Sequence, residues 1–437
     1  MKQDLEMKGN TLAIVLLVVG LVVGAGAGYF MAPKETVVED GGDGGTVTVE
    51  VAPLAGTNIQ LGYISSTTVG LETAVPLVED IMAADYNDYL DKLGMDTTVE
   101  FLIDDATGQA AVHLEKVQGY KSMDVNVFIG GGWSSQAQAA LSYCNDNDML
   151  MWSSSSTSPL LAIADDNLFR MCPTDLIQAP AIAEMLWSAG IEAVILIQRG
   201  DAWADGIYNY LEPAYTAKGG VILEKIRYAG EATEFANYLQ TAEDIAEDAV
   251  AEYGAEHVGV EIISFAEFVV MMSQAQDFPT VYDLTWFGSD GTTLSQQACD
   301  DAPEAVTNLK VHSTYAAPAD SDKFNDLYDR YFALVAQPFG YYSACSYDIG
   351  WVLMESMMNT QSLDATVLIP VQHRTAYNNF GASGWNQLNE DGDRYGSNYQ
   401  IWSYHYEGDV VVPYVTGLFD GITGQVTWYV DPHNPSA

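Results

Sequence analysis

The sequence predicts an α/β protein of two lobes, each a parallel sheet flanked by helices, behind an N-terminal transmembrane helix. An uncharged run of 21 residues lies near the N-terminus. From Asn58 onward, short apolar runs alternate with helix-period segments at intervals of roughly 25 to 40 residues, which indicates βαβ units. Most of these runs are continuously apolar, as in strands buried on both faces of a sheet.

The uncharged run extends from Thr11 to Met31. At about 1.5 Å per residue it matches a hydrocarbon core of about 30 Å, so it can span a bilayer. Lys2 and Lys8 precede it, so residues 1–10 are expected in the cytoplasm and the body outside the cell. A cleaved signal peptide is the open alternative, because the Ala-Gly-Ala sequence at 25–27 resembles a cleavage site.

Residues 32–57 contain an acidic, glycine-rich stretch that is too polar to build a core. Such a composition predicts a flexible linker. The body after it contains nine predicted strands, at 59–65, 99–103, 125–130, 149–153, 193–198, 221–228, 258–264, 284–288 and 309–315. Helices are predicted at 73–93, 135–145, 179–189, 203–218, 235–253, 268–276, 322–335 and 343–359. So many strands favour two lobes over one sheet.

Composition excludes several classes of function. With 437 residues, of which 48% are hydrophobic, the chain can fill two cores and is not a disordered protein. Sixty acidic residues against 16 basic ones give a net charge of −44, and no basic patch is present to bind nucleic acid. Repulsion on this scale is relieved by salt, which fits a saline exterior.

Catalytic and metal signatures are missing from the sequence. There is no GxxxxGK[ST], HExxH or GxSxG motif, and the six histidines are scattered. The four cysteines form no CxxC pair, so either two disulfides or four free thiols remain open. We therefore predict neither an enzyme nor a cofactor.

Unusual loops fall at the predicted carboxyl ends of strands. They lie at 130–135, 153–158, 199–203 and 288–291, and each offers hydroxyls, backbone N–H groups or an acid. In open parallel sheets, ligands bind at this edge. The loops therefore predict a ligand site.

These loops belong to an ordered series of motifs that resembles the leucine/isoleucine/valine-binding family of ABC transporter receptors. The series is FIGGGWSS at 128–135, MWSSSSTSPL at 151–160, LFRMCPTD at 168–175, WFGSDG at 286–291, ACSYD at 344–348 and FGASG at 380–384. The resemblance implies the type I periplasmic-binding fold, in which the chain crosses between lobes three times. It places residues 58–174 and 313–383 in the first lobe, 175–312 and 384–425 in the second, and 426–437 in a C-terminal tail.

On the first lobe, the resemblance implies that Ser134 and Thr157 hold the carboxylate of an amino acid and that Ser155 makes a backbone contact. A hydroxyl before a helix suits an anion, because it adds a donor to the unpaired N–H groups of the first turn. Ordinary helix capping is the alternative for each serine.

On the second lobe, the resemblance assigns the ligand ammonium to Asp290 and the aromatic lid to Trp203 and Phe265. A role in a tight turn is the alternative for Asp290, and plain packing is the alternative for both aromatic residues. Where the family often has tyrosine opposite the second lobe, this chain has Phe265, so the ligand's side chain stays open.

The sequence thus predicts an extracellular receptor that closes two lobes on a branched-chain-like amino acid. It would present the closed form to an ABC permease. A receptor for urea or another short amide, a sensing ectodomain and a cell-surface structural protein remain alternatives, because the fold alone does not separate them.

Overall fold

The computed structural model describes residues 35–40, 46–51, 53–396 and 398–434. The chain divides into an N-terminal unit up to Pro53 and a main unit from Leu54 onward. In the N-terminal unit, β1 (Glu35–Asp40) pairs antiparallel with β2 (Thr46–Val51). Part of the predicted linker is therefore a hairpin, because segments rich in β-branched residues lie on both sides of a glycine-rich stretch.

The predicted span at 11–31 lies outside the described residues. Among the helices that the structure describes, none is long and apolar enough to cross a membrane.

The first lobe is built on a five-stranded sheet in which all neighbouring strands are parallel. Its order is β4-β3-β5-β6-β7. The strands are β3 (Asn58–Ser65), β4 (Thr98–Asp105), β5 (Val127–Ile129), β6 (Leu150–Ser153) and β7 (Leu168–Arg170).

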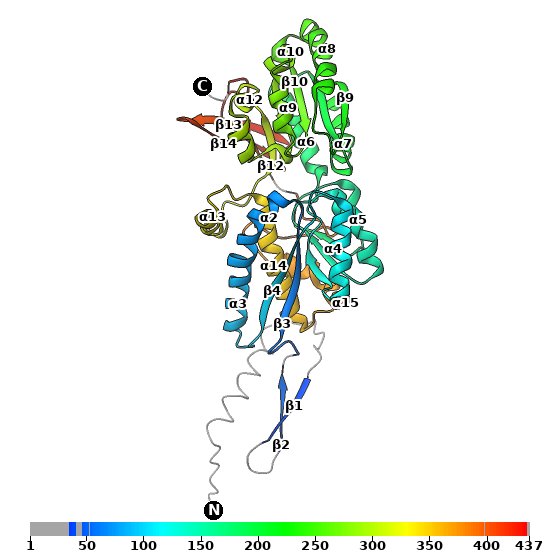
Figure 1. Ribbon diagram of the computed structural model, residues 1–437, viewed down its shortest axis with the longest axis vertical. Helices are drawn as coiled ribbons and strands as arrows, with labels where there is room; N and C mark the ends of the chain where they lie inside the picture. Colours follow the sequence, from blue (N-terminus) through cyan, green and yellow to red (C-terminus); the bar gives the residue numbers. More distant parts are fainter. Residues whose placement is uncertain (1–34, 41–45, 52, 397, 435–437) are drawn as a thin grey trace, which may run out of the picture. The chain divides into compact units, whose positions relative to one another are not determined.

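Helices cover both faces of this sheet, which explains the continuous apolar runs of its strands. In β5, Val127 and Ile129 pack into a core beneath α3 and α14, whereas Phe128 packs into a second core beneath α4 and α5. Figure 1 shows α3, α14 and α4 around the strands. The helices of this lobe are α2 (Thr68–Val75), a π-helical turn (Pro76–Met82), α3 (Ala83–Lys92), α4 (Ala110–Ser122), α5 (Ser134–Asp146), α13 (Asp322–Val335), α14 (Tyr341–Thr360), α15 (Ala365–Leu368) and α16 (Gln372–Asn378), with short 3₁₀ turns η2 (Pro159–Leu161) and η5 (Ile369–Val371).

The second lobe is built on an eight-stranded sheet of order β15-β14-β13-β12-β11-β10-β8-β9. Five strands are parallel, and β13 to β15 extend the sheet antiparallel. The prediction of a parallel sheet therefore holds for one part of this sheet. The strands are β8 (Ala193–Gly200), β9 (Val221–Ala229), β10 (Val258–Ile263), β11 (Thr285–Gly288), β12 (His312–Ala316), β13 (Tyr399–Glu407), β14 (Val410–Asp420) and β15 (Gln425–Trp428).

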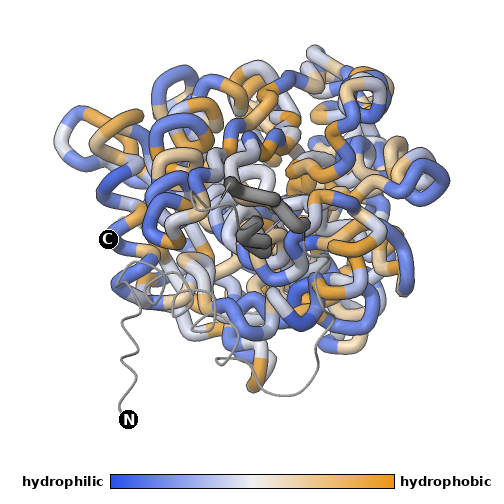
Figure 2. The backbone as a smooth tube through the Cα atoms, turned by 90° about the horizontal axis from the view of Figure 1, so that it is seen from below, coloured by the Kyte–Doolittle hydropathy of each residue, from blue (hydrophilic) through white to orange (hydrophobic). Residues whose placement is uncertain are grey.

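Helices of the second lobe are set by recognisable end signals. α7 begins where the Asp201 side chain accepts hydrogen bonds from two backbone N–H groups, and it ends at Gly219, whose φ is 105°. Hydrophobic and hydrophilic stretches alternate along the helices in Figure 2, as expected where one face is buried. The helices are α6 (Asp175–Ser188), α7 (Ala202–Lys218), α8 (Ala236–Tyr253), α9 (Phe268–Ala275), α10 (Pro279–Asp283), α11 (Gln296–Asp301) and α12 (Pro303–Asn308), with 3₁₀ turns η3 (Ala255–His257) and η4 (Asp290–Thr292).

Three lobe boundaries differ from the prediction. β12 pairs with β11 and β13, so residues 313–316 belong to the second lobe. Asp393 forms a buried ion pair with Arg170 at 2.5 Å, which keeps this segment with the first lobe beyond the predicted boundary at 384. β15 is a strand of the second sheet, so the predicted tail does not begin at 426.

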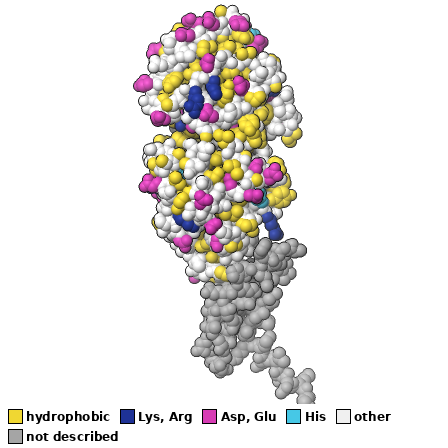
Figure 3. Space-filling view, turned by 90° about the vertical axis from the view of Figure 1, so that its right-hand side faces the viewer, with side chains coloured by type: hydrophobic (Ala, Val, Ile, Leu, Met, Phe, Trp, Pro, Cys, Tyr) yellow, Lys and Arg dark blue, Asp and Glu magenta, His cyan; other side chains and the backbone are white. Residues whose placement is uncertain are grey.

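The surface and the thiols bear on the chemistry that the sequence left open. Carboxylates are scattered over the face in Figure 3, whereas cations form small groups. All four cysteines are buried and free. The chain therefore has free thiols in place of the two disulfides that its cysteine count permits.

Candidate functional site

The carboxyl ends of the parallel strands in both sheets bring the unusual loops together, as the sequence predicted. On the first lobe, the N–H of Ser158 donates to Ser134 Oγ at 3.1 Å. Ser155 Oγ donates to the carbonyl of Gly132 at 2.9 Å. The serine loop and the start of α5 are thus one hydrogen-bonded unit.

Thr157 lies at the buried end of this unit. Its hydroxyl is almost completely buried and has no hydrogen bond of standard geometry among the described residues, although it interacts with the Asp175 carboxyl group and lowers the pKa of that group. Its carbonyl accepts a hydrogen bond from the N–H of Asp175 at 2.9 Å. A buried hydroxyl without a partner is costly, so a ligand group would satisfy it.

A cavity of about 170 Å³ opens beside the serine loop. Ten of its 17 lining residues carry a hydroxyl, and none carries a charged side chain. The hydroxyl-bearing residues are Tyr63, Ser65, Ser66, Thr67, Thr73, Ser154, Ser155, Tyr342, Ser343 and Ser346. Gly132 also lines it, and a Cβ there would stand 2.4 Å from Ser66 Oγ, so only glycine leaves room for this hydroxyl cluster. The cavity therefore suits a small polar group.

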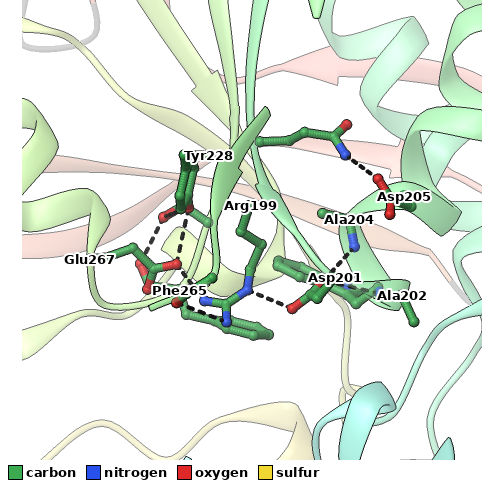
Figure 4. Close-up of polar contacts among 12 residues, drawn as sticks. Arg199, Asp201, Ala202, Ala204, Asp205, Tyr228, Phe265 and Glu267 are labelled. Atoms are coloured by element: carbon green, nitrogen blue, oxygen red, sulfur yellow. Dashed lines mark hydrogen bonds and ion pairs between the residues drawn. The ribbon is translucent and has the colours of Figure 1, made fainter. Parts of the chain in front are cut away.

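On the second lobe, Trp203 and Phe265 stack face to face, with ring centroids 4.3 Å apart and planes 7° apart. Trp203 is buried at the start of α7, and Phe265 follows β10. Figure 4 shows the Arg199 guanidinium above the Phe265 ring, at 4.5 Å from its centroid. A cation over an aromatic face is attracted by the ring quadrupole.

Two carboxylates hold this guanidinium in place. Arg199 Nε donates to Asp201 at 2.5 Å, and another of its nitrogens donates to Glu267 (Figure 4). Tyr228 adds a hydrogen bond to Glu267 at 3.0 Å. Burial alone would lower the pKa of Arg199, but the charges of Glu267 and Asp201 raise it. Arg199 therefore stays charged and fixed in position.

The two lobes touch at three places around the site. Trp133, which precedes α5, stacks on the other face of Phe265 at 4.5 Å. Ser158 Oγ donates to the carbonyl of Ala202 at 3.0 Å. Tyr342 of α14 donates to Asp290 at 2.6 Å. These contacts describe a closed cleft.

Asp290 lies in the 3₁₀ turn after β11 and is held from both lobes. Besides Tyr342, Gln178 Nε2 donates to it at 2.9 Å. Gln178 lies on the first turn of α6, which begins at Asp175. This arrangement brings two carboxyl groups close together.

Asp175 is completely buried, and neither carboxyl oxygen has a hydrogen-bond partner within the described residues. Burial, followed by the charge of Asp290, raises the pKa of Asp175 well above its ordinary value, against the effect of its interaction with the Thr157 hydroxyl. Burial likewise raises the pKa of Asp290, against the effect of its hydrogen bonds from Tyr342 and Gln178. Burial thus favours the protonated form of both acids.

The structure thus collects the predicted residues into two groups rather than one. Ser134, Ser155 and Thr157 share one loop unit, and of these Ser155 lines the cavity. Trp203 and Phe265 form the aromatic stack.

Sequence reasoning passed over Asp175, Trp133 and Tyr342. Asp175 is an acid that opens an otherwise apolar helix just after a strand, and Trp133 stands in the glycine-rich motif before α5. Both signals were visible in the sequence. Tyr342 was not, because it reaches the site from a helix far along the chain.

The fold and the cleft define a two-lobe ligand-binding protein of the type I periplasmic-binding class. The chain belongs to the family described as the receptor family ligand binding region, which it matches over residues 72–407. A relative, Uncharacterized protein MJ1266 of Methanocaldococcus jannaschii, is 27% identical over 360 residues, covering 78% of this chain and 84% of that protein.

Solved structures with this fold include leucine-binding protein LivK of Thermotoga maritima, with a TM-score of 0.64, 17% identity, and coverage of 82% of this chain and 98% of the other. LivJ of Streptococcus pneumoniae, in complex with isoleucine, matches with a TM-score of 0.65 and 16% identity. The match covers 82% of this chain and 99% of LivJ. A solute-binding protein of Rhodopseudomonas palustris, in complex with 3,4-dihydroxybenzoic acid, matches with a TM-score of 0.65 and 16% identity. The match covers 83% of this chain and 98% of that protein. At these identities the likeness establishes the fold. Together with the family match, it confirms the resemblance found in the sequence.

Proposed function

We propose that the protein binds a small polar α-amino acid between its two lobes and delivers it to an ABC permease. The observation that carries this proposal is the Asp175 carboxyl group, which is buried with no hydrogen bond of standard geometry among the described residues and lies beside Asp290. An ammonium group between the two acids would supply the missing donors. It would also neutralise two groups whose charges repel each other.

The carboxylate of the same ligand would lie against the first lobe. Ser134 is the first residue of α5, where the positive end of the helix dipole favours an anion. The buried Thr157 hydroxyl, which forms no hydrogen bond of standard geometry among the described residues, supplies a further donor. Ser134, Ser155 and Thr157 thus remain our proposed carboxylate site, with Asp175 added to Asp290 for the ammonium.

Cavity size and lining limit the side chain of the ligand. A cavity of about 170 Å³ is close to the roughly 150 Å³ cavity that takes up benzene, so the side chain must be small. Ten of the 17 lining residues carry a hydroxyl, so the methyl groups of leucine or valine would meet a largely polar wall. We therefore favour a polar side chain over the branched-chain preference expected from the sequence.

The setting of the receptor follows from the sequence and the relatives. Several neighbours of the same fold carry names of ABC transporter substrate-binding proteins, including those in complex with leucine and isoleucine. We propose the same transport role here, with the body outside the cell and the segment 11–31 as its membrane anchor. In this role the protein closes on its ligand and performs no chemistry.

Native mass spectrometry of the purified full chain tests for a ligand that co-purifies with it. Calorimetry with glutamine, serine, leucine, urea and 3,4-dihydroxybenzoate then tests its class. We expect glutamine or serine to bind more tightly than leucine, and urea and the benzoate not to bind. Binding of urea alone would retain the receptor role and overturn the amino-acid ligand. Binding of none of these compounds, without a co-purified ligand, would favour a structural role at the cell surface.

A further inference from the structure

A second cavity, of about 330 Å³, lies in the first lobe between α13 and α14, outside the cleft. One wall is α13, which contributes Lys323, Leu327 and Arg330 at positions i, i+4 and i+7, together with Asp326, which faces Arg330 at 3.6 Å. The opposite wall is α14, and the loop at 379–382 closes one end. Its volume falls within the range of roughly 300 to 1,000 Å³ typical of small-molecule sites.

The framework of this cavity is rigid. Asp348 of α14 accepts hydrogen bonds from the N–H groups of Ala382 and Ser383 at 2.7 and 2.8 Å. Gly381 packs directly on that carboxylate, because a Cβ there would stand 2.1 Å from Asp348. Arg330 forms a bidentate ion pair with Asp85 at 2.7 and 3.0 Å. The walls are thus fixed without a ligand.

Two residues of opposite charge in the cavity, Lys323 and Glu355, form no ion pair in the described part of the chain. Lys323 donates to the carbonyl of Phe380 and forms no ion pair with a carboxylate in the described part of the chain, although acids outnumber bases by 60 to 16 overall. A lysine ammonium has three donors, so two remain for another group. Glu355, half-buried on α14, has a single long contact, from Asn379 Nδ2 at 3.4 Å.

Glu355 and Lys323 interact electrostatically but do not form a direct ion pair. Burial raises the pKa of Glu355, while its contact with Asn379 and the charge of Lys323 lower it. A molecule that carries both an ammonium and a carboxylate would bridge the two groups and satisfy both. Trp351, held edge-on by Tyr86 at 4.9 Å, gives the cavity an aromatic wall for the apolar part of such a molecule.

We propose that this cavity is a second binding site for a small zwitterion, a free α-amino acid, with its carboxylate on Lys323 and its ammonium on Glu355. The site is independent of the ligand in the cleft. α14 connects the two sites, because its residues Ser343 and Ser346 line the cleft cavity, whereas Trp351 and Glu355 line this one.

The test uses the full chain labelled with 5-fluorotryptophan, with the Trp351 signal among the nine tryptophans assigned through Trp351→Phe. Millimolar glycine, glutamine or leucine should shift the Trp351 fluorine signal in the unmodified protein. The shift should persist in Asp175→Asn, because that substitution lies in the cleft. In Lys323→Met and in Glu355→Gln, the apparent affinity measured from the shift should be at least tenfold weaker. Lys92→Met is the matched control, because Lys92 is an exposed lysine on α3 paired only with Asp88.

Three outcomes would overturn the second site. The Trp351 signal could stay unchanged at saturating amino acid, or the shift could survive both Lys323→Met and Glu355→Gln. The third is a shift that disappears in Asp175→Asn, since the signal would then report on the cleft. If only the cleft proposal is wrong, amino acid should still shift the Trp351 fluorine signal equally in the wild type and in Asp175→Asn. This test of the second site therefore does not depend on the cleft proposal.

Discussion

Replacing Trp133 with alanine should open the cleft. Trp133 belongs to the first lobe, and its ring stacks on Phe265 of the second lobe at 4.5 Å, with the Arg199 guanidinium 5.4 Å from its centroid. Both contacts cross between lobes, so they exist only while the lobes are closed. The stack of Phe265 on Trp203 lies within the second lobe and is retained in both states.

The size of the effect follows from these two contacts. An aromatic pair contributes about 0.5–1.5 kcal/mol beyond its buried area. A partly exposed cation–π contact contributes about 0.5–1 kcal/mol. Their sum of about 1–2.5 kcal/mol corresponds to a roughly 5- to 70-fold shift toward the open form. Ligand affinity should fall by up to the same factor, because only the closed fraction is competent.

Small-angle X-ray scattering of the ligand-free full chain measures the opening as an increase in the radius of gyration. Trp385→Ala is the matched control, since Trp385 is a half-exposed tryptophan that contacts the Tyr377 ring at a tilted angle away from the cleft. Calorimetry on both variants measures the affinity. An unchanged radius and an unchanged affinity for Trp133→Ala would show that the stack does not hold the lobes together.

Four further predictions concern charge. Asp290→Ala should weaken amino-acid binding at least about tenfold, because charge-assisted hydrogen bonds contribute roughly 1.5–3 kcal/mol, whereas Ser134→Ala should cost less; calorimetry that finds equal losses would contradict this assignment. Asp175→Asn should raise the melting temperature at neutral pH. The raised pKa of Asp175 stabilises the fold below the ordinary pKa of about 3.9, and this contribution is lost as the pH rises through the folded value, so the gain should vanish in acid. Ligand binding should release protons, measured by calorimetry in two buffers, and affinity should rise with pH. Finally, the net charge of −44 predicts that the melting temperature rises from low to near-molar sodium chloride, and a flat profile would reject it.

Much of the fold could be predicted because continuous apolar runs and helical periods are local signals. The helix predicted at 322–335 has those bounds in the structure, and the strand predicted at 193–198 lies within β8. α4 was missed, because its buried face is formed largely by His113 and Tyr120, which do not read as apolar positions. β13 and β14 were missed, because their pattern mixes aromatic and polar residues along an antiparallel extension.

The site was predicted in part for the same reason. Loops at strand ends are local features, so Ser134, Thr157 and Asp290 could be selected from motifs. The partners that decide their chemistry come from distant segments: Tyr342 lies 52 positions from Asp290, and Gln178 lies 112 positions away. No local pattern reports such contacts.

The order in which the chain leaves the ribosome has a consequence for both lobes. The five strands of the first sheet are complete by Arg170, but the core on one of their faces includes Ile349, Val352 and Leu353 of α14. β12 of the second lobe cannot pair on one side until β13, which begins at Tyr399, has been synthesised. Neither lobe can finish folding during early synthesis, and an unpaired β12 is an open edge on which other chains can assemble. We expect the chain to remain incompletely folded, and to depend on a chaperone, until it has been synthesised almost completely.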